Sequence, residues 1–252
     1  MPAKNTYTAL MLDLDGTLIG RDERIAAPVA RAVSTVSARL SVSIVTGREP
    51  ADVLRFAREL GLTAPQVSDN GALILEAVSG RPLWSIPLGP DDARQIVTCL
   101  DEQGVDFIAT HPGGTVHDAA KVSDWNLTRV SALDLTEIRA DEVAALFRPN
   151  PNLHVVKASL PYNGLWAVDF TRVGANKATA VKELARMLGT KPEMMIAVGD
   201  SYNDLVLLEA CGLRIAMGNA PDELKDIAHH VAPTVDQDGL AAAIEEFVLP
   251  HL

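Results

Sequence analysis

The chain has 252 residues, of which 48% are hydrophobic and 22% are charged, and its formal net charge is −11. These values predict one large or two smaller globular domains, and the negative charge argues against nucleic acid or an anionic membrane surface as a partner. Residues 1–5 hold no apolar signal core and no segment reaches transmembrane length, so we expect a soluble cytoplasmic protein. The two cysteines, Cys99 and Cys211, lie in apolar surroundings and predict buried free thiols rather than a disulfide framework.

The N-terminal part begins with an apolar run at residues 8–12, which predicts a buried central strand. Two carboxylates, Asp13 and Asp15, follow where the run ends, and Gly16-Thr17 breaks the strand. Two like charges at the end of a buried strand are unfavourable unless a divalent cation or a lysine lies between them. Solvated acids at a strand end would also explain a lone Asp-x-Asp pair, but the full Asp-Leu-Asp-Gly-Thr string is far more specific.

The next unit has the order helix, strand, helix. Apolar residues recur at helical spacing over residues 28–40, residues 42–45 predict a strand, and a second helix is expected over residues 50–60. Thr46-Gly47-Arg48 lies between that strand and the second helix. A hydroxyl, backbone N–H groups and a helix N-terminus can together bind phosphate. For the triplet alone, an ordinary strand-to-helix turn is the favoured interpretation.

Asn70-Gly71 stands between two short apolar runs and predicts the turn of a β-hairpin. The pattern then becomes irregular, with strands expected at 84–86, 105–109, 153–159 and 165–170, helices at 91–103 and 141–147, and a turn at 161–164. This mixture predicts an inserted α+β domain, which divides the chain into residues 1–82, 83–168 and 169–252. His111 and His117 lack metal-ligand spacing and are expected in a solvated loop, and Trp125 and Trp166 are expected to pack inside the domain.

Lys177 occupies the first turn of a helix that Asn176 is expected to cap. The helix dipole disfavours a cation there by ~0.3–1 kcal/mol, so a specific partner is expected unless the side chain is simply exposed. An apolar strand at 194–198 then leads into Gly-Asp-Ser-Tyr-Asn-Asp at 199–204. Three acid or amide groups so close to a strand end favour a bound cation, and a capped turn before a helix at 205–210 is the alternative. A strand at 213–217, a loop at 218–221 that opens another helix, a short strand near residue 231 and a helix over 240–248 complete the chain.

Asp-Leu-Asp-Gly-Thr, Thr-Gly-Arg, a lysine at a helix start and Gly-Asp-Ser-Tyr-Asn-Asp follow one another in the order of the four motifs of the haloacid dehalogenase (HAD) superfamily. The chain therefore resembles the HAD phosphohydrolases. Asn-Gly-Ala at 70–72 and the inserted middle segment resemble their Cof-type branch, which is similar to subfamily IIB and carries a C2 cap. The resemblance implies an α/β fold: a Rossmann-like core with a parallel sheet, plus an inserted α+β cap domain of the C2B type.

The resemblance also implies a Mg²⁺-dependent phosphatase of small phosphorylated metabolites, sugar phosphates above all, that works through an aspartyl-phosphate intermediate. Asp13 would be the nucleophile and Asp15 the general acid and base, while Thr46 and Lys177 would hold the phosphoryl oxygens. The further phosphate- or substrate-binding positions implied are Gly16, Gly47, Arg48, Asn70 and Asn203. The metal ligands implied are Asp13, the backbone carbonyl of Asp15 and Asp200, with Asp204 and Asn203 in the outer shell.

Two other functions stay open at this point. A phosphotransferase or phosphomutase would use the same site but keep water from the aspartyl phosphate until a second substrate arrives. A non-catalytic protein that binds phosphorylated metabolites is disfavoured, because a retired site would be expected to lose at least one of the four residues Asp13, Asp15, Lys177 and Asp200.

Overall fold

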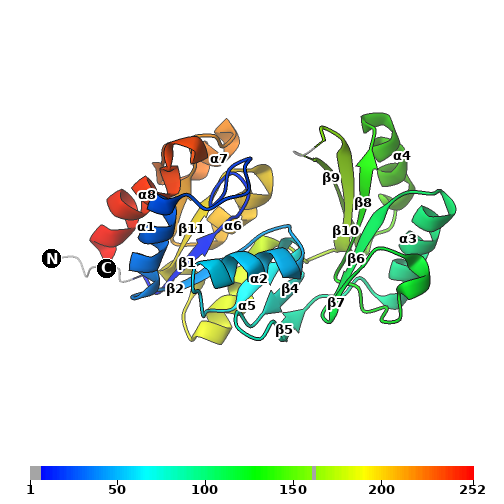
Figure 1. Cartoon of the computed structure of the whole chain (residues 1–252), viewed down its shortest axis with the longest axis horizontal. Coiled ribbons are helices and arrows are strands. Elements are labelled where there is room, and N and C mark those ends of the chain that lie inside the picture. The colour runs from blue at the N-terminus through cyan, green and yellow to red at the C-terminus, as the bar shows by residue number, and fades with distance from the viewer. Residues whose placement is uncertain (1–6, 161–162) are drawn as a thin grey trace.

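The computed structural model describes residues 7–160 and 163–252, and a five-stranded parallel sheet runs through its larger part (Figure 1). The strand order is β13-β12-β11-β1-β2. The strands are β1 (Ala9–Leu12), β2 (Ser41–Ile44), β11 (Met195–Gly199), β12 (Leu213–Ala216) and β13 (His230–Val231). All four pairings are parallel, with Leu12 opposite Ile44 on one side and Val198 on the other. The predicted Rossmann-like α/β core is confirmed, and β1 is a fully buried interior strand between β11 and β2, whereas β11 is the middle strand.

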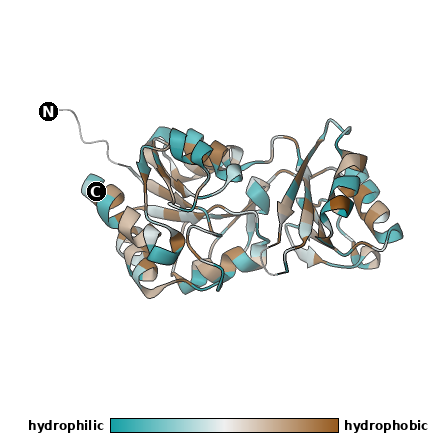
Figure 2. Cartoon of the chain, turned by 90° about the horizontal axis from the view of Figure 1, so that it is seen from above, coloured by the Kyte–Doolittle hydropathy of each residue, from teal (hydrophilic) through white to brown (hydrophobic). Residues whose placement is uncertain are grey.

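Helices cover both faces of this sheet, which explains why β1 is apolar at every position. On one face, Leu10 and Leu12 share a hydrophobic cluster with α1 (Ala27–Ser37), α2 (Pro50–Glu59) and α8 (Gly239–Ala243). On the other face, Ala9 and Met11 pack with α5 (Lys177–Leu188), α6 (Leu205–Ala210) and α7 (Asp222–Ile227). Figure 2 shows the resulting pattern, with brown hydrophobic strands inside and teal hydrophilic surfaces on the helices.

The predicted hairpin is present at the edge of this core. It belongs to a three-stranded antiparallel sheet of β3 (Gln66–Ser68), β4 (Leu73–Leu75) and β5 (Pro82–Ser85). The turn between β3 and β4 is a 3₁₀ segment, Asp69–Gly71, in which Asp69 and Asn70 adopt positive φ angles of 51° and 54°. Gly71 is required there because a Cβ atom would lie 2.2 Å from the carbonyl oxygen of Asn176, just before α5.

The middle of the chain forms a second, antiparallel five-stranded sheet in the order β7-β6-β8-β10-β9. Its strands are β6 (Phe107–His111), β7 (Gly114–Val116), β8 (Arg129–Leu135), β9 (Leu153–Ser159) and β10 (Trp166–Arg172). Two helices, α3 (Pro90–Glu102) and α4 (Glu137–Phe147), enclose a separate hydrophobic cluster against one face. Figure 1 shows both helices on the side away from the parallel sheet, so the opposite face of the second sheet is turned toward the core.

Sequence patterns missed two strands of this second sheet. Neither β7 nor β8 was predicted, yet β8 lies at the centre of the sheet between β6 and β10. β8 escapes notice because Arg129 and Ser131, two of its seven residues, are polar and nevertheless buried. Helix α4 also begins four residues earlier than predicted, because Thr136 caps it by accepting a hydrogen bond from the Arg139 N–H group. The domain boundaries stay a prediction, and β10 runs across the one placed after residue 168.

Most of the smaller expectations for this region are confirmed. Trp125 and Trp166 pack against the cluster beneath α3 and α4, and both cysteines are free thiols, although Cys99 is only half-buried. The expected loop position holds for the exposed His117 but is wrong for His111, which is the last residue of β6 and lies 3.8 Å from the carboxylate of Asp124. The predicted turn at 161–164 and the N-terminal segment 1–5 fall partly or wholly outside the described residues.

Short 3₁₀ turns connect several elements: Ala119–Lys121, Pro192–Met194, Tyr202–Asp204, Val235–Gln237 and Leu249–His251. After α8, a π-helical segment, Ile244–Val248, completes the helix that was predicted over residues 240–248. Within residues 7–160 and 163–252, no helix combines the length and the hydrophobicity needed to cross a membrane.

Candidate active site

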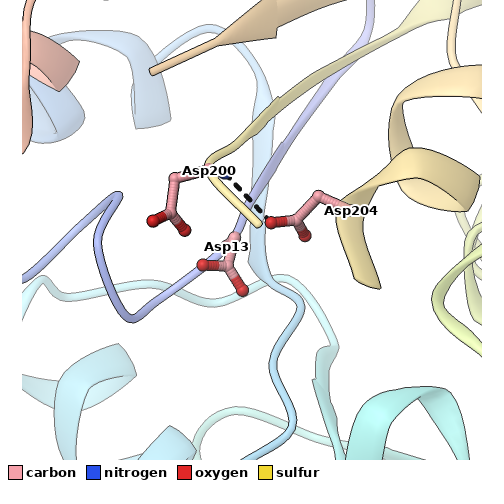
Figure 3. A group of neighbouring side chains, drawn as sticks. All are labelled: Asp13, Asp200 and Asp204. Carbon is pink, nitrogen blue, oxygen red and sulfur yellow. Dashed lines mark hydrogen bonds between the residues drawn. The ribbon is translucent and has the colours of Figure 1, made fainter. Parts of the chain in front are cut away.

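Three carboxylates converge where β1 and β11 end side by side. Asp13 directly follows β1, Asp200 directly follows β11, and Asp204 stands at the start of α6 (Figure 3). Because parallel neighbouring strands end at the same edge of a sheet, the two strand ends bring these side chains together. The backbone N–H group of Asp13 donates to the Val198 carbonyl at 3.0 Å, and one oxygen from each of the three carboxylates lies within 4.8 Å of the others.

Lys177 completes this group from the first turn of α5. Its side chain is fully buried, and its Nζ donates to Asp13 Oδ1 at 2.6 Å and to Asp204 Oδ1 at 2.7 Å. Burial lowers the pKa of the Lys177 ammonium, but the two carboxylates outweigh burial and raise this pKa above its ordinary value. The carboxylates of Asp13 and Asp204 therefore keep Lys177 protonated, although the helix dipole disfavours a cation at this position.

The carboxylates themselves carry more negative charge than Lys177 can balance. Burial, and then the charge of Asp204, raises the pKa of Asp13 well above its ordinary value, and the same two causes raise the pKa of Asp200 to about 6. Asp204 has both oxygens engaged, Oδ1 by Lys177 and Oδ2 by the backbone N–H groups of Asp200 and Ser201 at 3.0 Å. Asp13 and Asp200 are less fully engaged, and together with Asp204 they form a group of hard oxygen ligands that could hold a divalent metal.

Asp15 lies apart from this cluster. Its carboxylate is half exposed and pairs with Arg48, whose Nη2 and Nε donate to its two oxygens at 2.7 and 3.0 Å. The same guanidinium contacts Glu23 at 2.8 Å and Asp52 at 3.3 Å. The structure therefore pairs the Asp15 side chain with Arg48, and among the described contacts none joins it to Asp13 or Asp200.

Glycine is essential at position 16 in the same loop. Gly16 has a φ angle of +79°, and a Cβ atom there would lie 2.0 Å from Asp200 Oδ2. The loop that follows Asp13 can thus approach the Asp200 carboxylate only because residue 16 has no side chain.

The remaining predicted phosphate-binding residues gather along the same edge. Thr46 is almost fully buried, its hydroxyl oxygen accepts from the Arg48 N–H group at 3.2 Å, and its carbonyl accepts from the Asn70 N–H group at 2.9 Å. The side-chain amide of Asn203 donates to the Asn70 side chain at 3.4 Å. The loops after β2, β3 and β11 therefore meet around the carboxylate cluster.

Asn219 is a site residue that sequence patterns did not single out, although they predicted a loop at residues 218–221. Its Nδ2 donates to Asp200 Oδ2 at 2.8 Å and to the Gly16 carbonyl at 3.0 Å, and its Oδ1 accepts from the Val235 N–H group at 2.9 Å. One amide thus fixes both the Asp200 carboxylate and the loop that follows Asp13.

We expect Asn219→Ala to lower the affinity for a divalent metal by about 10- to 100-fold, the range seen when a group that orients a metal ligand is lost. Titration calorimetry of the purified protein with Mn²⁺ measures this directly. Asn126→Ala serves as the matched control, because the Asn126 side chain bonds to Asp124 on a distant loop. Equal metal affinities for the parent and Asn219→Ala would show that Asn219 does not position Asp200.

A second unforeseen group joins the antiparallel sheet to this edge. Arg129, on β8, donates from Nη1 to the Gly47 carbonyl at 2.6 Å and lies 3.3 Å from the buried carboxylate of Asp69. Thr128 donates to the other oxygen of Asp69 at 2.7 Å. Burial raises the pKa of Asp69 to about 6 although Arg129 opposes the shift. No sequence signal pointed to these residues, because the strand that carries Arg129 was not predicted.

The sequence is similar to a known family of hydrolases and to several phosphatases. A model of haloacid dehalogenase-like hydrolases matches residues 10–129 and 114–244. A putative phosphatase of Haemophilus influenzae is 28% identical over 259 residues, covering 95% of this chain and 98% of that protein. The 5-amino-6-(5-phospho-D-ribitylamino)uracil phosphatase YitU of Bacillus subtilis is also 28% identical, covering 94% of this chain and 96% of that protein.

Solved structures agree on the fold. A haloacid dehalogenase-like hydrolase from Bacteroides thetaiotaomicron superposes with a TM-score of 0.82 at 22% identity, covering 95% of this chain and 98% of that one. A HAD subclass IIB sugar phosphatase superposes with a TM-score of 0.76 at 22% identity, with the same coverage. Because the family model spans the core, the inserted sheet and all the strand ends that form the site, the chain belongs to the haloacid dehalogenase-like hydrolases, as a phosphatase of their Cof-type branch.

Proposed function

We propose that this phosphatase hydrolyses sugar phosphates, uses Mg²⁺, and forms a phosphoryl intermediate on Asp13. The observation that carries the proposal is the fully buried Lys177, which holds Asp13 and Asp204 while Asp200 faces the same centre. The relatives act, by their names, on small phosphorylated metabolites that differ widely, among them pyridoxal phosphate and phosphoglycolate. This breadth supports a small phosphorylated substrate, and sugar phosphate is the class that we select.

In the proposed first step, Asp13 Oδ attacks the phosphorus in line and the bond to the leaving oxygen breaks. Asp13 suits this role because Lys177 Nζ donates to its Oδ1 at 2.6 Å and so fixes the orientation of the carboxylate at the end of β1. Lys177 and the Thr46 hydroxyl bind the phosphoryl oxygens as negative charge redistributes over them. When bound between Asp13 and Asp200, Mg²⁺ would supply further positive charge for the phosphate and for the carboxylates.

Asp15 acts in both proposed half-reactions. It donates a proton to the leaving oxygen, and in the second step it accepts a proton from the water that attacks the phosphorus and releases Asp13 and phosphate. Arg48 holds its two oxygens at 2.7 and 3.0 Å, which fixes the orientation of this half-exposed carboxylate while leaving it accessible. Arg48 is thus a positioning residue for Asp15 in addition to any contact with substrate.

Phosphate release from a panel of phosphorylated metabolites tests the proposal, with Mg²⁺ and with EDTA. We expect hydrolysis that requires the metal and is fastest for sugar phosphates. Release without metal would contradict the Mg²⁺ requirement, and a ranking led by other metabolites would contradict the substrate class. No release, together with a phosphorylated Asp13 trapped from an activated donor, would instead indicate a phosphotransferase.

The affinity for Mg²⁺ should rise with pH. The pKa of Asp200 is about 6 and that of Asp13 is raised well above its ordinary value, so both carboxyls must release protons before they can bind the ion. Between about pH 5 and pH 7 we therefore expect tighter binding and a proton release that calorimetry detects as a dependence on the buffer. Asp200→Asn should bind more weakly and lose the part of the dependence centred near pH 6. An affinity that is constant over this interval would contradict the assignment.

A further inference from the structure

The core-facing side of the antiparallel sheet carries rows of side chains across its strands, and the row that contains Asp169 is one of them. Val168 and Phe170 point into the hydrophobic cluster beneath α3 and α4, so Asp169, between them on β10, points to the opposite face. Strand register sets Asp169 opposite Ser131 on one side and Val156 on the other, with Ile108 beyond Ser131. The row therefore reads Ile108, Ser131, Asp169, Val156 across four strands.

The adjacent row lies closer to the core. Thr110, Arg129 and Thr171 of this row are buried, the exposed His154 of β9 stands opposite Thr171 at its end, and Arg129 reaches the Gly47 carbonyl at 2.6 Å. Gly47 lies between Thr46 and Arg48, the proposed phosphate-binding residue and the residue that holds Asp15. Asp169 is thus the first charged side chain beyond a buried layer that touches the catalytic loop.

Two neighbours hold the Asp169 carboxylate in place without covering it. The Ser131 hydroxyl donates to Asp169 Oδ1, Arg129 Nη1 lies 3.7 Å from the same oxygen, and 31% of the Asp169 side chain remains exposed. The described hydrogen bond and ion pair of Asp169 both involve Oδ1 and not Oδ2. The guanidinium of Arg129 already contacts the Gly47 carbonyl and the carboxylates of Asp69 and Asp169. The polar atom that this row can offer to a ligand is therefore the second carboxylate oxygen of Asp169, Oδ2.

We propose that Asp169 determines substrate specificity by accepting a hydrogen bond from a hydroxyl group of the leaving group. The inference rests on the proposed function and narrows it to neutral polyol or sugar phosphates. An oriented carboxylate between the aliphatic side chains of Ile108 and Val156 suits a hydroxylated carbon chain, which offers donors beside C–H groups. The same carboxylate disfavours a leaving group that bears a carboxylate or a second phosphate, because like charges repel.

The test compares neutral and anionic leaving groups in the full-length protein. For parent, Asp169→Ala and Asp169→Asn, kcat and KM are measured on the best neutral polyol phosphate among glucose 6-phosphate, ribose 5-phosphate and sorbitol 6-phosphate, and on 2-phosphoglycolate. We expect kcat/KM for the neutral substrate to fall by about 10- to 100-fold in Asp169→Ala, mainly through KM, as when a hydrogen bond to a charged group is lost. The relative activity on 2-phosphoglycolate should rise in both variants.

Controls separate recognition from folding. Asp101→Asn removes the same charge from the exposed surface of α3 and should leave the ratio between the two substrates unchanged. Asp169→Asn keeps an acceptor for Ser131, so it reports on selectivity if Asp169→Ala fails to fold. Glucosamine 6-phosphate, with an ammonium group, distinguishes a hydroxyl acceptor from a site that attracts positive charge.

Each outcome decides the inference. A substrate ratio unchanged by either Asp169 variant would overturn it while the proposed function stands. A parent that prefers 2-phosphoglycolate would overturn both the inference and the proposed sugar phosphate substrate class. An Asp169-dependent preference of more than about tenfold for glucosamine 6-phosphate over glucose 6-phosphate would overturn hydroxyl recognition. If the parent hydrolyses neither these substrates nor p-nitrophenyl phosphate, the proposed function fails, and the inference falls with it.

Discussion

Asp13→Asn will lower phosphate release by about 10⁴-fold or more, because the change removes the proposed nucleophile and a proposed carboxylate ligand of Mg²⁺. An amide has nearly the volume of the carboxylate and still offers an oxygen to Lys177, which also keeps Asp204 as a buried anionic partner at 2.7 Å. We therefore expect a folded protein with an unfolding transition close to that of the parent. Phosphate release and thermal unfolding, measured on the same preparation, test both halves of the prediction.

Trapping experiments identify the bond that forms. An acyl phosphate on Asp13 reacts with hydroxylamine or borohydride, so mass spectrometry should find the modified residue at position 13 in the parent and not in Asp13→Asn. Asp226→Asn, on the exposed surface of α7, is the matched control and should retain parental turnover. Near-parental hydrolysis by Asp13→Asn would exclude a covalent intermediate on this residue.

The core and the approximate place of its site could be predicted because both depend on local patterns. The apolar run before Asp13 can only be a strand buried on two faces, and the strand end then fixes where its carboxylates lie. Lys177 was notable because its position opposes the helix dipole, and the structure shows the two anions that compensate. Strand order was not needed for these inferences, since the ends of all parallel strands share one edge.

The connections between sheet and site were not predictable, because they depend on contacts distant in sequence. Arg129 reaches Gly47 across 82 residues of chain, and Asn219 reaches Gly16 across 203. Strand β8 was missed for the same reason, since its buried Arg129 and Ser131 are satisfied by partners on the core and on β10. A polar residue in a strand favours a loop assignment unless its partner is known. The pairing of Asp15 with Arg48 could not be predicted either, because the two residues belong to separate sequence motifs and only the folded structure brings them together.

Lys177→Met will lower both activity and stability. Methionine can fill most of the space of the lysine stem, but it leaves the buried carboxylates of Asp13 and Asp204 without their cation. Removing one partner of a buried ionic group typically costs about 3–5 kcal/mol of unfolding free energy. Loss of the positive charge at the phosphoryl oxygens should also slow turnover by about 10²- to 10³-fold. Lys182→Met is the matched control, because Lys182 is an exposed residue of the same helix. Steady-state kinetics measure the effect on turnover, and denaturant unfolding measures the effect on stability.

The pH dependence of the loss distinguishes an electrostatic cause from simple mispacking. In the parent, the pKa of Asp13 is raised by burial and held down by Lys177, so removing Lys177 raises it further. A folded-state pKa above the unfolded value means that the carboxyl stabilises the fold below the unfolded pKa and that this contribution is lost as the pH rises through the folded pKa. The destabilisation of Lys177→Met relative to the parent should therefore be small near pH 4 and full near about pH 8 in metal-free protein. A deficit of equal size at both pH values would show that Lys177 stabilises the fold by packing, and that its two ion pairs contribute little.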